Sequence, residues 1–501
     1  MHKAVLAIDQ GTTGTTALVM GADGAVLGSA YAEISQQYPQ PGWVEQDPEE
    51  IWRVSLAVVG EALESARLPA GGLASIGITN QRETTIVWER SSGEPAYPAV
   101  VWQSRQTSAI CDALRSDGLE PLIRERTGLV ADPYFSASKA QWILDRLPDG
   151  RARAATGELL FGTVDTWLLY RLTGGELHAT EPTNASRTLL YNIYEQRWDP
   201  ELLEIFGIPE AMLPEVRPSA GTFGLTRPSG AVPGGVPVAG IAGDQQAALY
   251  GQGCWRAGMI KNTYGTGCFV VLNTGPEPQT SKCGLLTTIC CDATGGPAYA
   301  LEGSIFTTGA AIQWLRDELG LIGSAIETEE VARRVRDTQG VYVVPAFTGL
   351  GAPFWDMHAR GGVVGLTRGS GRDQIIRATL DSIAYQTRDV IDAMKCDAFA
   401  AVSELRADGG ASANNQLMQF QADILGIPVV RPKLLETTAA GAAYLAGLGS
   451  GFWREPEEIE GIWQEDRRFT PAMEPSERER LYAGWRRAVA RVLTEGREEV
   501  P

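Results

Sequence analysis

The amino-acid sequence predicts an α/β protein of two domains that share one order of secondary-structure elements. Three observations lead to this prediction: the length of the chain, a glycine- and threonine-rich turn after the first strand, and a second such turn about 250 residues later. The turns read GTTGTT at 11–16 and YGTG at 264–267. A chain of 501 residues is long enough for two α/β domains of about 250 residues each.

The first half opens with three apolar, β-branched segments that are separated by very short turns. Turns this short predict antiparallel pairing of the three strands. A helix is expected next, because Asp47 is a good N-cap, Pro48 suits the first helical position, and apolar residues then recur at helical spacing from Ile51 to Leu63. The strands expected in this half lie at 3–9, 15–20, 25–31, 74–79 and 84–89.

The second half repeats this order. Strands are expected at 259–263, 268–274, 284–291 and 298–303, followed by a helix that contains Ile312, Leu315 and Leu319. A further strand ends in the glycines at 409–410 and leads into a helix from 411 onward. Ser476 and Glu479 suggest a capping box for a last helix with Leu481, Trp485, Val489 and Val492 facing inward. Small residues at 245–258 suggest the boundary, so the predicted domains are 1–250 and 251–501.

Composition excludes several classes of function. The formal net charge of −18 disfavours nucleic acid and anionic membranes as partners. No apolar run reaches the roughly 18 residues of a membrane span, so no integral membrane association is expected. Asp9 stands where a signal peptide would still be apolar, and we therefore expect a cytoplasmic protein.

Cysteine and histidine usage points away from disulfide and zinc chemistry. The seven cysteines are an odd number without any C-x-x-C pair, which predicts neither a disulfide framework nor a zinc site and suits a reducing compartment. Only His2, His178 and His358 are present, with no H-E-x-x-H motif. A general base is therefore expected to be a carboxylate.

The two glycine turns match neither of the commonest nucleotide motifs. GTTGTT lacks the lysine of a P-loop, and no G-x-G pair continues to the third glycine of a dinucleotide fingerprint. Each turn taken alone could be an ordinary tight turn. Because small turns expose backbone N–H groups and add hydroxyl donors, two of them facing each other could hold one polyphosphate from both sides.

Ten segments, in the same order, resemble the glycerol kinase family within the sugar-kinase superfamily. The resemblance covers roughly residues 4–465, and NQRETT with GIAGDQQAA favours glycerol over the pentuloses of related kinases. The segments are AIDQGTTGTT, GWVEQDPEEIW, ITNQRETTIVW, VWQSRQT, DPYFSASK, TNASRTLLYNI, GIAGDQQAALYGQ, KNTYGTGCF, TGLGAPFWD and ADGGASANN.

This resemblance implies a fold, a reaction and a set of site residues. The fold would be two ribonuclease-H-like (actin-like ATPase) domains around a central cleft. The reaction would be ATP-dependent phosphorylation of glycerol to sn-glycerol 3-phosphate, with magnesium, in a homodimer or homotetramer. The implied glycerol site is Arg82, Glu83, Trp102, Tyr134, Asp244, Gln245 and Phe269. The implied nucleotide site is Thr12, Thr13, Gly14, Thr266, Gly309, Gln313, Gly410 and Asn414, with Asp9 and Asp244 at the metal and Asp244 as the catalytic base.

The residue types suit this chemistry. Glycerol is neutral, and each of its hydroxyls costs about 1–3 kcal/mol if it is buried without a partner. Arg82 can donate, Glu83 and Asp244 can accept, and the Trp102 ring suits the C–H edge. By themselves, however, the first two residues could equally form an exposed ion pair on a loop, and Asp244 could be only a helix cap.

Two departures and two alternatives remain open. Thr15 and Thr16 stand where many relatives have an arginine. Residues 229–238 contain no basic residue, and this second departure predicts insensitivity to fructose 1,6-bisphosphate. No histidine lies between His178 and His358 to serve as a phosphorylation site. The alternatives are a kinase for another sugar or polyol, and an actin- or chaperone-like ATP-driven binding protein, since one fold can host both.

Overall fold

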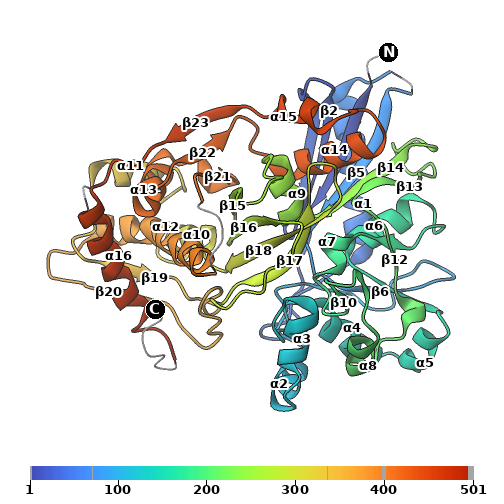
Figure 1. Cartoon of the computed structure of the whole chain (residues 1–501), viewed down its shortest axis with the longest axis horizontal. Helices are drawn as coiled ribbons and strands as arrows, with labels where there is room; N and C mark the ends of the chain where they lie inside the picture. The colour runs from blue at the N-terminus through green and yellow to red at the C-terminus, as the bar shows by residue number, and fades with distance from the viewer. Residues whose placement is uncertain (1–2, 70, 336, 398–401, 495–501) are drawn as a thin grey trace.

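Two large mixed sheets, one from each half of the chain, form the framework of the molecule (Figure 1). The computed structural model describes residues 3–69, 71–335, 337–397 and 402–494. Residues 1–2, which include His2, and residues 495–501 lie outside these ranges, so the start of the predicted domain 1–250 and the end of the predicted domain 251–501 are not described. Each sheet has its own hydrophobic core, and the chain passes from the first sheet to the second between residues 243 and 260.

The first sheet has the strand order β13-β14-β5-β1-β2-β3. β1, β2 and β3 pair antiparallel, as predicted, and β5 and β14 run parallel to β1. β1 and β5 are buried almost throughout because both faces of the central strands are covered, which explains their continuous apolar runs. The bounds are β1 Ala4–Gln10, β2 Gly14–Gly21, β3 Val26–Glu33, β5 Leu73–Asn80, β13 Ala220–Leu225 and β14 Pro237–Gly243.

The second sheet has the order β17-β18-β16-β15-β21-β22-β23. β15, β16 and β18 are antiparallel neighbours, and β21 and β22 run parallel to β15. The five central strands therefore repeat the first sheet, although the third strand of the meander is β18 and β17 lies outside it. The bounds are β15 Ile260–Tyr264, β16 Cys268–Gly275, β17 Leu286–Cys291, β18 Pro297–Ile305, β21 Leu405–Asp408, β22 Val429–Pro432 and β23 Glu465–Phe469.

Short strands and helices complete the first half. α1 begins as predicted: the Asp47 side chain accepts a hydrogen bond from Glu49 N at 2.9 Å, and Pro48 occupies the first turn. The helices are α1 Pro48–Ala66, α2 Ser108–Ser116, α3 Glu120–Thr127, α4 Ser136–Leu144, α5 Gly150–Ala155, α6 Val164–Leu172, α7 Pro182–Ala185, α8 Pro200–Phe206, α9 Asp244–Gly251 and the 3₁₀ turn η1 Glu210–Met212. The short strands are β4 Glu45–Gln46, β6 Ile86–Glu89, β7 Ala99–Val100, β8 Leu159–Gly162, β9 Ala179–Thr180, β10 Tyr191–Asn192, β11 Arg197–Trp198 and β12 Glu215–Val216.

Helices of the second half, among them α12 and α13, pack on its sheet, whereas α14 does not. Among the described residues, no helix is both long enough and apolar enough to cross a membrane. The helices are α10 Gly309–Asp317, α11 Glu327–Arg334, α12 Arg372–Cys396, α13 Asn415–Leu425, α14 Thr437–Gly449, α15 Pro456–Glu460, α16 Pro475–Val489 and the 3₁₀ turn η2 Gly410–Ala413. β19 Tyr342–Val344 and β20 Gly362–Val364 form a separate hairpin.

Two local predictions for this half are wrong. The expected capping box at Ser476 and Glu479 is absent, because α16 begins earlier, at Pro475, after an extended Glu474 whose side chain makes no capping bond. Leu319 lies beyond the end of α10 and is 43% exposed. The inward-facing Trp485 and Val489 of α16 are buried as expected.

Helix α14 belongs to the second half but packs on the first sheet, beside β5 and β14 and against α9 (Figure 1). Its backbone approaches so closely that a Cβ on Gly441 would lie 1.8 Å from Ala247 O, and one on Gly77 would lie 2.2 Å from Ala442 O. Only glycine permits such an approach. The two halves therefore meet through a seam of backbone contacts.

The cysteines correct one prediction. Cys283 and Cys396 form a disulfide across 113 residues of sequence, where no disulfide was expected. The other five, Cys111, Cys254, Cys268, Cys290 and Cys291, are buried and free. The odd count gave no signal of this pair, because the two sulfur atoms meet only when the end of α12 packs beside the segment before β17.

Candidate functional site

The first predicted phosphate loop is the tight turn between β1 and β2. Gly11 N donates to Gly14 O at 2.9 Å, and a Cβ on Gly14 would lie 2.6 Å from both Ala32 O and the Tyr31 ring. Glycine is therefore required at position 14. Thr12 is half-buried, and the Thr13 side chain is exposed.

The second predicted phosphate loop, between β15 and β16, lies against the start of α10. Gly265 N donates to Gly267 O at 2.9 Å, and the backbone of Gly309 donates back to Gly265 O at 3.1 Å. A Cβ on Gly309 would lie 2.5 Å from the same carbonyl oxygen. The structure thus brings Thr266, which is exposed, together with Gly309.

The predicted adenosine residues lie beside this second loop. Gly409 has φ of +81°, and a Cβ there would lie 2.6 Å from Tyr264 O, so the chain enters η2 directly alongside the loop. A Cβ on Gly410 would meet no atom within 4 Å. Asn414 caps α13 by accepting from Gln416 N and Leu417 N, each at 3.0 Å, while Gln313 is exposed on α10.

Arg82 and Glu83 form a buried charge site at the end of β5. They are 2% and 1% exposed, so the reading as an exposed loop ion pair is wrong. Glu83 has φ of +61°, a left-handed conformation that is uncommon for residues other than glycine. Its backbone oxygen accepts from Thr85 Oγ1 and Ser136 Oγ, each at 3.0 Å, which holds this turn in place.

Aromatic rings from both halves surround this charge site. Trp102 lies 5.5 Å from Tyr134 and 6.3 Å from Phe269, measured between ring centroids, and both pairs are edge-to-face. Arg82 lies over the Phe269 ring, with Cζ 5.8 Å from its centroid. Phe269 comes from β16, so the second half supplies one wall.

Asp244 starts α9 directly after β14, with its carboxylate next to Arg82. Its Oδ1 lies 3.2 Å from Arg82 Nε and accepts from Gln245 N at 2.7 Å. Its Oδ2 accepts from Gln245 Nε2 at 3.1 Å. The Asp244 side chain keeps 27% of its surface exposed, so it can be reached from solvent as well as anchored.

Negative charge accumulates between the two halves near Asp9. Burial, together with the carboxylates of Asp244 and Glu436, raises the pKa of Asp9 well above its usual range. In the part of the chain that the structure describes, no three His, Cys, Asp or Glu side chains gather as a metal cage. The carboxylate oxygens of Asp9 and Asp244 suit Mg²⁺, which prefers oxygen ligands and keeps several waters and substrate oxygens in its shell.

Several buried polar residues at this site were missed from the sequence. Arg187 and Glu302 are fully buried and contact Arg82 or Glu83, and Gln246 Oε1 accepts from Arg82 NH1 at 3.2 Å. Lys261 is buried and donates to Gln245 Oε1 at 2.6 Å, and burial lowers its pKa to about 8. The available signal was a charge inside an apolar strand, as in MIKNT at Lys261 and YALEG at Glu302.

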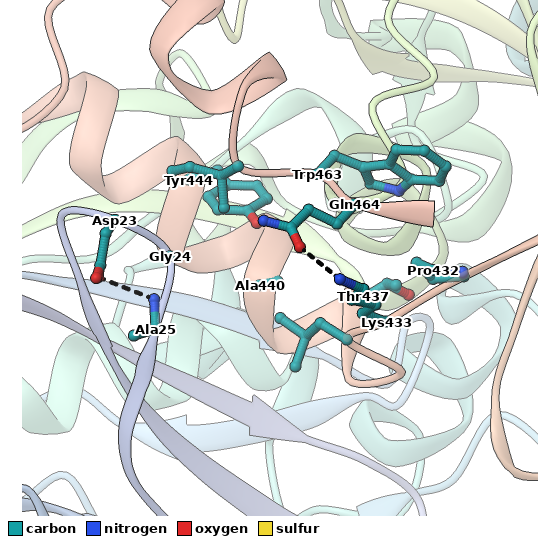
Figure 2. Close-up of a pocket in the computed structure, with 13 residues that line it drawn as sticks. Asp23, Gly24, Ala25, Pro432, Lys433, Thr437, Ala440, Tyr444, Trp463 and Gln464 are labelled. Carbon is teal, nitrogen blue, oxygen red and sulfur yellow. Dashed lines mark hydrogen bonds between the residues drawn. The ribbon is translucent and has the colours of Figure 1, made fainter. Parts of the chain in front are cut away.

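A cavity of about 290 Å³ lies away from this cluster, between the β2–β3 turn and the second half (Figure 2). Lys433 Nζ donates to Gln464 Oε1 at 2.9 Å on one side of it, and Asp23 Oδ1 accepts from Ala25 N on the other. None of the predicted site residues lines this cavity.

Models of one protein family match both halves of the chain. The FGGY family of carbohydrate kinases, N-terminal domain, matches residues 4–251, and its C-terminal domain matches residues 260–450. The glycerol kinase of Caldanaerobacter subterraneus subsp. tengcongensis is 58% identical over 495 residues, which cover 98% of this chain and 99% of that protein. Glycerol kinase 2 of Thermotoga maritima is 56% identical over 493 residues, with 98% and 99% covered.

Solved structures with the same fold include the crystal structure of Plasmodium falciparum glycerol kinase with ADP. It is 34% identical, with a TM-score of 0.91 and 99% of both chains covered. The xylulose kinase of Lactobacillus acidophilus, solved in a ligand-bound form, is 21% identical with a TM-score of 0.84, covering 97% of this chain and 98% of that one. At that identity the likeness is one of fold alone.

Proposed function

The chain belongs to the FGGY family of carbohydrate kinases, and from this we infer that it transfers the γ-phosphoryl group of ATP to glycerol, giving sn-glycerol 3-phosphate. The relatives at 55–58% identity over nearly the whole chain are glycerol kinases. The fold class predicted from the sequence is confirmed: two ribonuclease-H-like domains of the actin-like ATPase type.

One observation from the site supports glycerol best: a buried donor–acceptor pair enclosed by aromatic rings. Arg82 and Glu83 are shielded from water, while Trp102, Tyr134 and Phe269 supply apolar walls. A small neutral polyol needs this combination, because its hydroxyls must be paired when they are buried and its C–H edge needs apolar contact.

We assign glycerol recognition to hydrogen bonds with Arg82, Glu83 and Gln245, which lie beside Asp244. Arg82 would donate to one hydroxyl. Glu83 has one oxygen taken by Arg187 Nε at 2.6 Å, so its other oxygen would accept from a second. Gln245, whose amide is held by Lys261 and Asp244, would orient the third. Such positioning is the main contribution that a protein makes to phosphoryl transfer.

Asp244 would act as the general base. Its carboxylate would accept the proton of a terminal glycerol hydroxyl as that oxygen attacks the γ-phosphorus in line, and the bond to the β–γ bridging oxygen breaks. Gln245 N and Arg82 Nε hold Oδ1 at 2.7 and 3.2 Å. Oδ2 bears only the longer amide contact, so we assign proton transfer to Oδ2.

The nucleotide would lie between the two glycine turns. Thr12, Thr13, Gly14 and Thr266 would donate to phosphate oxygens, since backbone N–H groups and hydroxyls in such turns bind anions without a basic surface. Gly410 and Asn414 would border the adenosine, with Gly309 and Gln313 on α10. Open space at the Cβ position of Gly410 agrees with a ligand close to the backbone.

Asp9 and Asp244 would hold Mg²⁺. The raised pKa of Asp9 beside two further carboxylates marks a place where a cation relieves repulsion between like charges. When bound, the ion neutralises charge on the β- and γ-phosphate oxygens. Asp9 would contribute its carboxylate from near the end of β1, close to those of Asp244 and Glu436.

A coupled ADP-release assay with glycerol tests the proposal. ATP turnover should depend on added glycerol and should exceed turnover with xylulose, gluconate or no acceptor by at least about 100-fold in kcat/KM. A preference for another polyol would favour the other sugar kinases of the family. Turnover that is independent of any acceptor would favour an ATP-driven binding protein. We further propose a cytoplasmic homodimer or homotetramer, to be checked by fractionation and light scattering.

A further inference from the structure

Arg82 is held from behind by a carboxylate that comes from the other half of the chain. Glu302, on β18, accepts from Arg82 NH1 with Oε2 at 2.6 Å and from Arg82 NH2 with Oε1 at 3.1 Å. This two-point contact fixes the plane of the guanidinium group. It occupies the end of the group and leaves the Nε edge facing Asp244 at 3.2 Å.

Arg187 ties this pair to Glu83. Its Nε donates to Glu83 Oε1 at 2.6 Å and its NH2 to Glu302 Oε1 at 2.9 Å. Both Arg187 and Glu302 are fully buried. Burial acts to raise the pKa of Glu302, but the guanidinium groups of Arg187 and Arg82 outweigh this effect and lower the pKa to about 2. The four side chains thus form a buried group of two cations and two anions, which Arg82 Nε extends to the partly exposed Asp244.

Stability alone does not account for such a group. A protein with well-packed apolar residues in place of a buried ion network is often at least as stable, because the cost of desolvating the charges offsets their attraction. What the network provides is geometry: two charged residues of the polyol site, Arg82 and Glu83, have their orientation set by Arg187 and Glu302. One of these comes from the second half.

We propose that Glu302, acting with Arg187, is a positioning residue that aims Arg82 and Glu83 at glycerol, so that the polyol site forms only when the second sheet is seated against the first. This inference rests on the proposed function. Glu302 has no role in proton or phosphoryl transfer; it acts through Arg82. Loss of its charge therefore affects glycerol recognition more than nucleotide recognition.

The test compares Glu302→Gln with Asp381→Asn. Both remove the charge of one second-half carboxylate that pairs with arginine, but Asp381 pairs with Arg377 at 2.7 Å, outside the network. Glu302→Gln should raise the KM for glycerol at least about tenfold and leave the KM for ATP within about twofold. Asp381→Asn should change neither KM. Arg187→Gln should resemble Glu302→Gln, and the double variant should fall short of the product of the two single effects.

The outcomes are distinct. If wild-type protein does not phosphorylate glycerol, the proposed function itself is wrong. If the wild type is active and Glu302→Gln keeps its KM for glycerol, or raises both KM values equally, the positioning role is wrong. Thermal melting reports whether Glu302→Gln folds, and if it does not, Arg187→Gln decides by the same criteria.

Discussion

Trp102 Nε1 donates a 2.8 Å hydrogen bond to Thr12 Oγ1, which joins a wall of the polyol site to the first phosphate loop. The same loop is held on its other side by Gln46 Nε2, which donates to Thr12 O at 2.7 Å. The position of the loop that we assign to phosphate is therefore set partly by the ring that we assign to glycerol.

Trp102→Phe should separate the two roles of this side chain, because it keeps the aromatic wall of the polyol site and removes the hydrogen-bond donor to Thr12. A hydrogen bond of this kind contributes about 0.5–1.5 kcal/mol, so kcat/KM for ATP should fall roughly 2- to 10-fold while the KM for glycerol changes less. Steady-state kinetics with each substrate varied in turn measure both. Thr12→Ser, which keeps the acceptor, serves as the control. A larger effect on glycerol than on ATP would show that the hydrogen bond does not control the loop.

Asp244→Asn should lose turnover while glycerol still binds. Removal of a general base costs about 10²- to 10⁴-fold in rate, and the amide keeps the shape of the side chain. Calorimetric titration with glycerol, alongside single-turnover assays, distinguishes binding from chemistry. Turnover within about threefold of wild type would remove Asp244 from the role of base.

Arg82→Ala should affect both recognition and stability. The substitution leaves Glu302 buried without one of its cations, and breaking a buried pair typically costs about 3–5 kcal/mol. The KM for glycerol should rise strongly and the KM for ATP little, together with a lower melting temperature. Arg377→Ala, which breaks the largely shielded pair with Asp381, should lower the melting temperature without changing the KM for glycerol. A change confined to ATP would contradict the assignment of Arg82.

Fructose 1,6-bisphosphate should not inhibit. Residues 229–238 contain no basic residue. The neighbouring Arg227 is exposed and is paired with Glu176 through both Nε and NH2. A bisphosphate site usually depends on arginine forks. An activity titration to millimolar concentration at low ionic strength gives the most sensitive test, since screening is weakest there. Saturable inhibition that Arg227→Ala abolishes would refute this prediction.

The Cys283–Cys396 disulfide should be detectable by counting thiols. Protein denatured without reductant should react at five of its seven cysteines, and at all seven after reduction. In the loop-closure model, a link that closes about 100 residues stabilises by roughly 4.7 kcal/mol, so Cys283→Ser should lower the melting temperature under oxidising conditions. Cys111→Ser, at a buried free cysteine, is the control. Seven reactive thiols before reduction would mean that the bond does not form in solution.

Local features were predicted well because neighbouring residues determine them. The β1–β2–β3 meander follows from two short turns, and the start of α1 follows from Asp47 and Pro48. The end of α10 before Leu319 was missed, since apolar spacing continues past the last helical residue.

Long-range features were not accessible in the same way. Glu302 meets Arg82 across 220 residues, and Arg187 meets Glu83 across 104. No local pattern pairs them; a charge inside an apolar strand indicates only that a partner must exist. The resemblance named the residues that would touch glycerol, and the fold was needed to find those that hold them.

The glycines of the seam between α14 and the first sheet have a consequence for protein engineering. Gly441 and Gly77 lie where even a methyl group would collide with backbone atoms of the facing element, so a saturation library should find these positions nearly as intolerant as Asp244. A chimera that joins the first half of this chain to the second half of a distant kinase would fail at the seam unless α14 and α9 were exchanged as a pair. The unit of recombination in this molecule is therefore the matched helix pair, and a crossover point after α9, at 252–259, divides it.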